Sequence, residues 1–135
     1  MDRFDKDDWI SVDQQSPVTY ITNDKYSTNG EYMDIVRTTY EQLRRDYAMS
    51  EYDFSRNWLK KSRGYFAYLK CTGSEPSLEA ILALYGEAMR RTELFEQLET
   101  QHSGMQRDLY RQRGHYFRDI TQKLESEIRQ MALAN

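Results

Sequence analysis

The sequence contains little cysteine, proline and histidine, and no long apolar run. Its single cysteine, Cys71, excludes an internal disulfide and a cysteine-cluster metal site. His102 and His115 are the only histidines and fall on different predicted elements, so no metal site is expected. No segment approaches the roughly 18 apolar residues of a membrane helix. The start, MDRFDKDDWI, is acidic where a secretory signal is basic and then apolar. We therefore expect a cytoplasmic protein that binds no membrane.

The sequence also has no recognisable catalytic motif. Acid pairs such as Glu93 and Glu96 occur on predicted helices, but surface helices carry such residues routinely. Neither a nucleophile paired with a histidine nor a glycine-rich phosphate loop accompanies them. We expect no catalytic residues, no cofactor and no enzymatic activity.

Charge is distributed unevenly along the 135 residues, whose formal net charge is -3. Residues 1–31 hold seven acids and three bases, residues 32–70 hold five acids and eight bases, and residues 71–135 hold ten acids and eight bases. The middle third is thus the one positive part of the chain. Within it, FSRNWLKKSRGYFAYLK at residues 54–70 carries five bases and no acid. This aromatic-laced segment is where a polyanion would be attracted.

Hydrophobic spacing predicts an all-α fold after an irregular acidic arm at residues 1–31, in which VTYIT favours one short strand. Helices are predicted from Tyr32 to about 47, from Ser50 to about Leu59, from Ser62 to about 71, from about 78 to 98, and over about 28 residues from Met105. Ser50 and Asp53 have the spacing of a capping box. The expected inward faces comprise the following residues: Met33, Val36, Tyr40, Leu43 and Tyr47 on the first helix, and Leu78, Ile81, Leu82, Tyr85 and Met89 on the fourth. Trp58, one turn after Phe54, is expected in the core.

Residues 50–89 resemble the helix-turn-helix domain of phage repressor and Cro-type (Xre-like) regulators, with the wider likeness covering about residues 32–90. In that family a capped second helix and a turn precede a third helix that begins Ser-Arg-x-Tyr, and Pro-Ser then precedes a leucine-rich helix. The matching residues are Ser50, Phe54 and Leu59, then SRGYFAYLK from Ser62 and EPSLEAILALYGEAM from Glu75. The chain differs at the turn, where LKKS replaces the usual glycine and apolar residue, and at Lys70, where a glutamate is common.

The resemblance implies a sequence-specific, DNA-binding transcriptional regulator whose third helix, residues 62–70, enters the major groove of double-stranded DNA. Ser62, Phe66 and Leu69 would face inward. The expected base contacts are Arg63, Gly64, Ala67 and Tyr68, with Arg63 the best candidate for a guanine edge. The expected phosphate contacts are Arg56, Lys60, Lys61, Tyr65 and Lys70. The alternative interpretation of this charge run is a solvated helical face with aromatic residues in the core.

The last predicted helix carries an apolar stripe that either folds back on the core or pairs with a second copy. We favour a homodimer, with the stripe as its interface: Phe117, Ile120, Leu124, Ile128 and Met131. The predicted organisation is thus an acidic arm at 1–31, a helix-turn-helix-like domain at 32–100 and a dimerisation helix at 105–133.

A second functional hypothesis is a protein-binding inhibitor or adaptor, such as a phage-encoded inhibitor of a host protein, built on the same scaffold. The acidic total and the altered turn favour it. The arm, with a sum of -4, would then contact a protein partner, with Trp9 as a possible anchor. Salt-dependent binding to duplex DNA distinguishes the two hypotheses.

Overall fold

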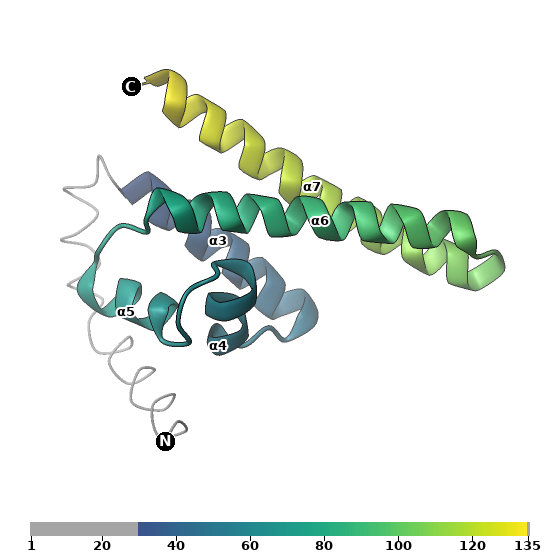
Figure 1. The fold of residues 1–135 in the computed structure, drawn as a ribbon, viewed down its shortest axis with the longest axis horizontal. Coiled ribbons are helices and arrows are strands. Elements are labelled where there is room, and N and C mark those ends of the chain that lie inside the picture. Colours follow the sequence, from purple (N-terminus) through teal and green to yellow (C-terminus); the bar gives the residue numbers. More distant parts are fainter. Residues whose placement is uncertain (1–29, 135) are drawn as a thin grey trace. The chain divides into compact units, whose positions relative to one another are not determined.

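The computed structural model describes residues 30–134, and these residues form α-helices and one π-helix with no strand (Figure 1). The elements are α3 (Gly30–Tyr47), α4 (Glu51–Asp53), η1 (Phe54–Trp58), α5 (Tyr65–Thr72), α6 (Leu78–Gln101) and α7 (Gly104–Ala134). The predicted all-α class is confirmed. The predicted arm, its short strand and Trp9 lie outside the described residues, apart from the two arm residues that open α3. No helix in the described range is sufficiently long and apolar to cross a membrane.

The chain divides into two compact units, residues 1–81 and 82–135. The structure describes residues 30–81 of the first unit and 82–134 of the second. This division falls inside α6, whereas the sequence suggested a boundary in the loop near Gly104. Helix α6 runs without a break from Leu78 to Gln101 and so belongs to both units. The loop near Gly104 separates two helices of the second unit and does not separate the two units.

The first unit has an aromatic core. Tyr40 of α3 lies with its ring centroid 5.2 Å from that of Phe54 and 4.8 Å from that of Phe66. Its hydroxyl donates a hydrogen bond to the Met49 carbonyl at 3.3 Å, and burial raises the pKa of this phenol. Trp58 is fully buried, as expected. Tyr40, Phe54 and Phe66 belong to α3, η1 and α5, so the contacts among their rings hold these three elements together.

The apolar face predicted for α3 is largely confirmed, because four of its five residues are buried: Met33, Val36, Tyr40 and Leu43. Tyr47 is the exception and is 42% exposed. It occupies the last position of α3, where the chain turns through Ala48 at a positive φ of 56°. The last residue of α3 therefore lies outside the core, against which the middle of the helix packs.

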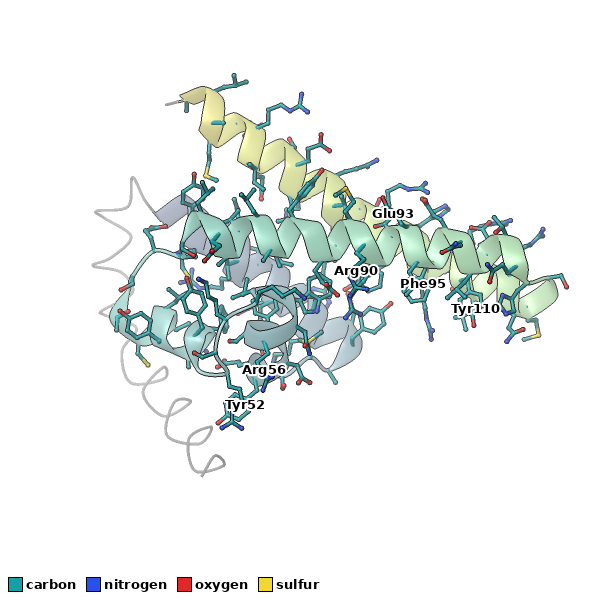
Figure 2. All side chains as sticks on the ribbon, in the orientation of Figure 1. Tyr52, Arg56, Arg90, Glu93, Phe95 and Tyr110 are labelled. Atoms are coloured by element: carbon teal, nitrogen blue, oxygen red, sulfur yellow. The ribbon has the colours of Figure 1, made fainter. Side chains whose placement is uncertain are left out.

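The second unit is built on a helical hairpin of α6 and α7. The ring of Phe95 stacks on that of Phe117 at 5.7 Å, and the hydroxyls of Thr92 and Thr121 lie 3.2 Å apart in the buried seam. Figure 2 shows Phe95 on α6 and Tyr110 on α7. The centroids of their rings lie 6.1 Å apart. Arg111 donates to Glu99 at 2.8 Å, and Arg118 pairs with Glu96. The hairpin thus combines apolar packing with ion pairs along its edge.

The inward face predicted for α6 is wrong in part. Ile81 is buried, but Leu78, Leu82 and Met89 are 56%, 51% and 38% exposed. The fully buried α6 positions are instead Ala80, Ile81, Leu84 and Ala88. The larger apolar residues were expected to form the buried face, but two small alanines, Ala80 and Ala88, lie on it instead.

Candidate nucleic-acid interface

The predicted helix-turn-helix segment forms two short helical elements joined by an irregular connection. The Ser50 side chain accepts a hydrogen bond from the backbone N–H of Asp53 at 3.0 Å, so the predicted N-cap is confirmed. The helix continues from Asp53 into η1, where the N–H of Leu59 bonds to the carbonyl of Phe54, five residues back. A π-helical turn of this kind inserts one residue into helical spacing and recurs at functional sites.

The connection between the two elements contains a strained residue. Lys60 has a φ of 57°, in the left-handed region that favours glycine. Its ammonium group donates to the Asn57 carbonyl at 2.7 Å. The sequence has lysines at the turn where the family that it resembles has a glycine. Here the backbone of Lys60 takes a glycine-like conformation with a basic side chain attached.

A buried hydrogen bond connects the two elements. The Ser55 hydroxyl, in η1, accepts from the backbone N–H of Phe66 at 3.0 Å, and Ser55 is fully buried. Phe66 is the second residue of α5, whose N-cap is Gly64 and supplies no capping side chain. Ser55 therefore satisfies an N–H at the start of α5 from the preceding element.

Helix α5 begins at Tyr65 and not at Ser62, which corrects two orientations. Ser62, expected to face inward, is exposed and lies before the helix. Ala67, expected to contact a base, is only 2% exposed and cannot reach DNA. Because successive helix residues are about 100° apart, a face centred between Phe66 and Lys70 covers Ala67 as well as Leu69. The buried face of α5 is broader than the two-residue stripe assumed from the sequence.

The other base-contact candidates are accessible. Arg63 and Gly64 are exposed just before α5, and Tyr68 is 53% exposed on it. The guanidinium of Arg63 lies 5.5 Å from the ring centroid of Tyr52, which is a cation–π contact with α4. A side-chain carbon at Gly64 would meet no atom within 4 Å, so this part of the surface is open.

The phosphate-contact candidates separate into two groups. Arg56 and Lys60 are exposed, and Figure 2 shows Arg56 and Tyr52 projecting from the α4–η1 segment. Lys61 instead donates to Glu79 at 2.8 Å, and Lys70 donates to Glu51 at 2.5 Å. These acids lie 18 and 19 residues away in sequence, so the pairs could not be predicted from local spacing.

The ion pair of Lys61 and Glu79 affects both groups. The hydrogen bond from Lys61 lowers the pKa of the Glu79 carboxyl, and the same bond raises the pKa of Lys61. Tyr65 adjoins this pair, because its ring lies 5.7 Å from the Lys61 ammonium. The Tyr65 hydroxyl also accepts from the backbone N–H of Ser77 at 3.0 Å. Tyr65 and Lys61 thus help to place the segment that leads into α6.

The predicted dimerisation residues are mostly covered within a single chain, which corrects their assignment. Phe117, Ile120 and Leu124 are 3%, 2% and 1% exposed, and Met131 is 9% exposed. Phe117 stacks on Phe95 of α6, so the stripe folds back within the chain. Of the five residues, only Ile128 is half-buried.

The histidines and the cysteine form no site. His102 Nδ1 lies 2.8 Å from the Leu98 carbonyl, and its ring meets the edge of Tyr110 at 4.9 Å. His115 is exposed on α7, and Cys71 is half-buried on α5. Within residues 30–134 no three metal-ligating side chains gather into a cluster.

Comparison with known proteins assigns a family without an activity. No curated protein and no solved structure matches the chain. One family profile matches residues 36–135, which include every helix described after the start of α3. The chain belongs to DUF6626, a family of unknown function.

Proposed function

We propose that residues 50–73 bind duplex DNA as a helix-turn-helix unit and that the protein is a sequence-specific transcriptional regulator. The observation that carries the proposal is the hydrogen bond from the Phe66 N–H to Ser55, which fixes α5 against the preceding helical element. A recognition helix must be held rigidly by its partner helix to present side chains to base edges. The glycine-like conformation of Lys60 in the connection also supports the proposal, since helix-turn-helix turns often contain glycine.

The proposed base contacts are Arg63, Gly64 and Tyr68. Residues at the amino end of a recognition helix usually contact base edges, and Arg63 and Gly64 directly precede α5. Arginine makes two hydrogen bonds to the O6 and N7 atoms of guanine. The open space at Gly64 permits close approach of the DNA backbone or a base.

The proposed phosphate contacts are Arg56 and Lys60, both exposed near the turn. Lys61 and Lys70 are assigned a lesser role because their charges are already compensated by Glu79 and Glu51. Each phosphate contact contributes about -0.9 to the slope of log Kobs against log salt concentration. We therefore expect a shallower slope than five free bases would produce.

The compensation of Lys61 and Lys70 also favours a second candidate, a protein-binding inhibitor or adaptor that uses the same surface. Two engaged bases reduce the attraction of the segment for a polyanion. In this case the exposed Arg63 and Tyr68 would contact an acidic or aromatic protein surface. The two candidates differ in whether salt-dependent DNA binding occurs at all.

The test is binding of the purified full chain to labelled duplex fragments that flank its own gene, measured by fluorescence anisotropy at two salt concentrations. A selection from random duplexes would supply a site if those fragments fail. Arg63→Ala should cost about 1–3 kcal/mol and relax the preference for one base position. Arg107→Ala removes the same charge from an exposed position on α7 and should leave affinity unchanged.

The outcomes separate the candidates. Selective binding that is lost with Arg63→Ala and retained with Arg107→Ala supports the regulator. Equal loss in both variants would indicate nonspecific charge attraction and contradict sequence-specific reading. No binding to flanking or selected duplexes at low salt would overturn the proposal and favour a protein partner.

A further inference from the structure

An open groove of about 240 Å³ lies on the second unit, between α6 and α7. Its lining consists of Leu82 and Tyr85 from α6 and of Glu125, Ile128 and Arg129 from α7. Figure 1 shows the two helices close together near their connecting loop and apart toward the carboxyl end of α7. The groove therefore forms where the hairpin opens.

The floor of the groove is apolar and accessible. Leu82 is 51% exposed, and Ile128 and Tyr85 are half-buried. Met89, 38% exposed, continues the α6 side because it lies seven residues, about two turns, beyond Leu82. Contiguous exposed apolar side chains with a polar rim are typical of an interaction surface.

The rim of the groove carries one acid and one base. Arg129 donates to Glu125 at 2.9 Å, and their side chains are 68% and 48% exposed. A surface with both signs of charge at one rim is complementary to itself when a two-fold axis reverses the direction of the helix. If two α7 helices cross antiparallel near residue 127, Glu125 of each copy lies opposite Arg129 of the other.

We propose that this groove is a homodimer interface, in which Leu82 and Ile128 of two copies pack together and Glu125 pairs with Arg129 across the two-fold axis. The charge pattern favours a second copy of this chain as the partner, because a single two-fold operation places each acid and base, already paired within its own chain, beside the opposite charge of the other copy. The interface shares only Ile128 with the stripe expected from the sequence, of which Phe117, Ile120 and Leu124 are buried within each chain. The inference is independent of DNA binding.

The first test is sedimentation equilibrium of the full chain over roughly two orders of magnitude in concentration. We expect a concentration-dependent dimer. Leu82→Glu should dissociate it, because a charge would enter the apolar floor. Leu94→Glu makes the same change at another exposed leucine of α6 and should leave the dimer intact. Circular dichroism and thermal unfolding establish that both variants are folded.

The second test reverses the rim charges. Glu125→Arg leaves two bases at each rim and Arg129→Glu leaves two acids, so each variant alone should dissociate about tenfold or more readily. Mixed together, the two variants should form a heterodimer, because each basic rim then faces an acidic one.

Three results would overturn the proposal. One is a wild-type chain that stays monomeric at every concentration. Another is a dimer that Leu82→Glu leaves unchanged, which would place the interface elsewhere. The third is failure of the two charge-reversed variants to associate when mixed, although both are folded. Recovery of the heterodimer, by contrast, requires residues 125 and 129 of different copies to be adjacent.

Discussion

The Ser55 hydroxyl accepts a hydrogen bond from the backbone N–H of Phe66 across eleven residues of sequence, at 3.0 Å. Both residues are buried, and Gly64 at the N-cap of α5 offers no side chain for the same purpose. One hydroxyl therefore both caps α5 and sets its position against η1. The rigidity of the proposed DNA-reading element depends on this contact.

Ser55→Ala should lower the free energy of unfolding by about 1–3 kcal/mol, because a buried N–H loses its acceptor. Urea unfolding followed by circular dichroism measures the change. Ser126→Ala, at an exposed position in the middle of α7, is the control and should be neutral or slightly stabilising. Equal stability of the two variants would mean that Ser55 does not cap α5.

Lys60→Gly should raise the free energy of unfolding by roughly 0.5–1 kcal/mol, since glycine adopts the φ of 57° without strain. Lys60→Ala retains the strain and should not stabilise. If Lys60 contacts a phosphate, both variants should reduce the salt slope of DNA binding by about one. A slope unchanged in both would remove Lys60 from the contact set, and destabilisation by glycine would contradict the strain argument.

Glu79→Gln should strengthen DNA binding, because it releases Lys61 from its ion pair. The salt slope should steepen by about 0.9 if the released ammonium reaches a phosphate. The matched control is Glu93→Gln, which removes the same charge from an exposed position on α6 in the second unit. Identical gains in both variants would attribute the effect to net charge alone.

The ion pair of Lys61 and Glu79 also predicts a pH dependence. Because the pKa of Glu79 is lowered in the folded state, its stabilising contribution is present above the unfolded pKa of a glutamate and is lost as pH falls through the lower folded value. The raised pKa of Lys61 preserves the pair until pH rises through that value. A carboxyl NMR titration should give Glu79 a midpoint below the ordinary range, which Lys61→Met restores to normal. An unshifted wild-type midpoint would refute the pair in solution.

Gly114→Ala should stabilise α7 by roughly 0.5–1 kcal/mol, because alanine is the better helix former. A side-chain carbon there would lie 3.6 Å from Cβ of Phe95, an ordinary contact distance. Gly86→Ala on α6, with no atom within 4 Å, should give a similar gain and serves as the comparison. Thermal unfolding measures both. Destabilisation by Gly114→Ala alone would show that the seam between α6 and α7 is tighter than described.

The local sequence pattern was sufficient to predict most of the helices. Spacing of apolar residues identified α3 and α7, and the Ser50 cap identified the start of α4, because each signal is confined to a few helical turns. The extent of α6 followed from the same periodicity. In the candidate site, Arg63, Gly64 and Tyr68 were assigned to the surface by position, and they are exposed.

The burial and ion pairing of side chains whose partners are distant in sequence were decided by the tertiary structure. Ala67 is buried because α5 is covered over a broad arc, and Lys61 and Lys70 are compensated by acids 18 and 19 residues away. The apolar spacing of the stripe from Phe117 to Leu124 fitted both packing within the chain and pairing with a second copy. In the structure the stripe packs against α6 of the same chain. The sequence by itself determined the helices and the location of the basic segment, since these arise from local periodicity and composition. Which bases and which apolar residues remain available to a partner was decided only when the helices packed, because burial and ion pairing are properties of side chains brought together in space.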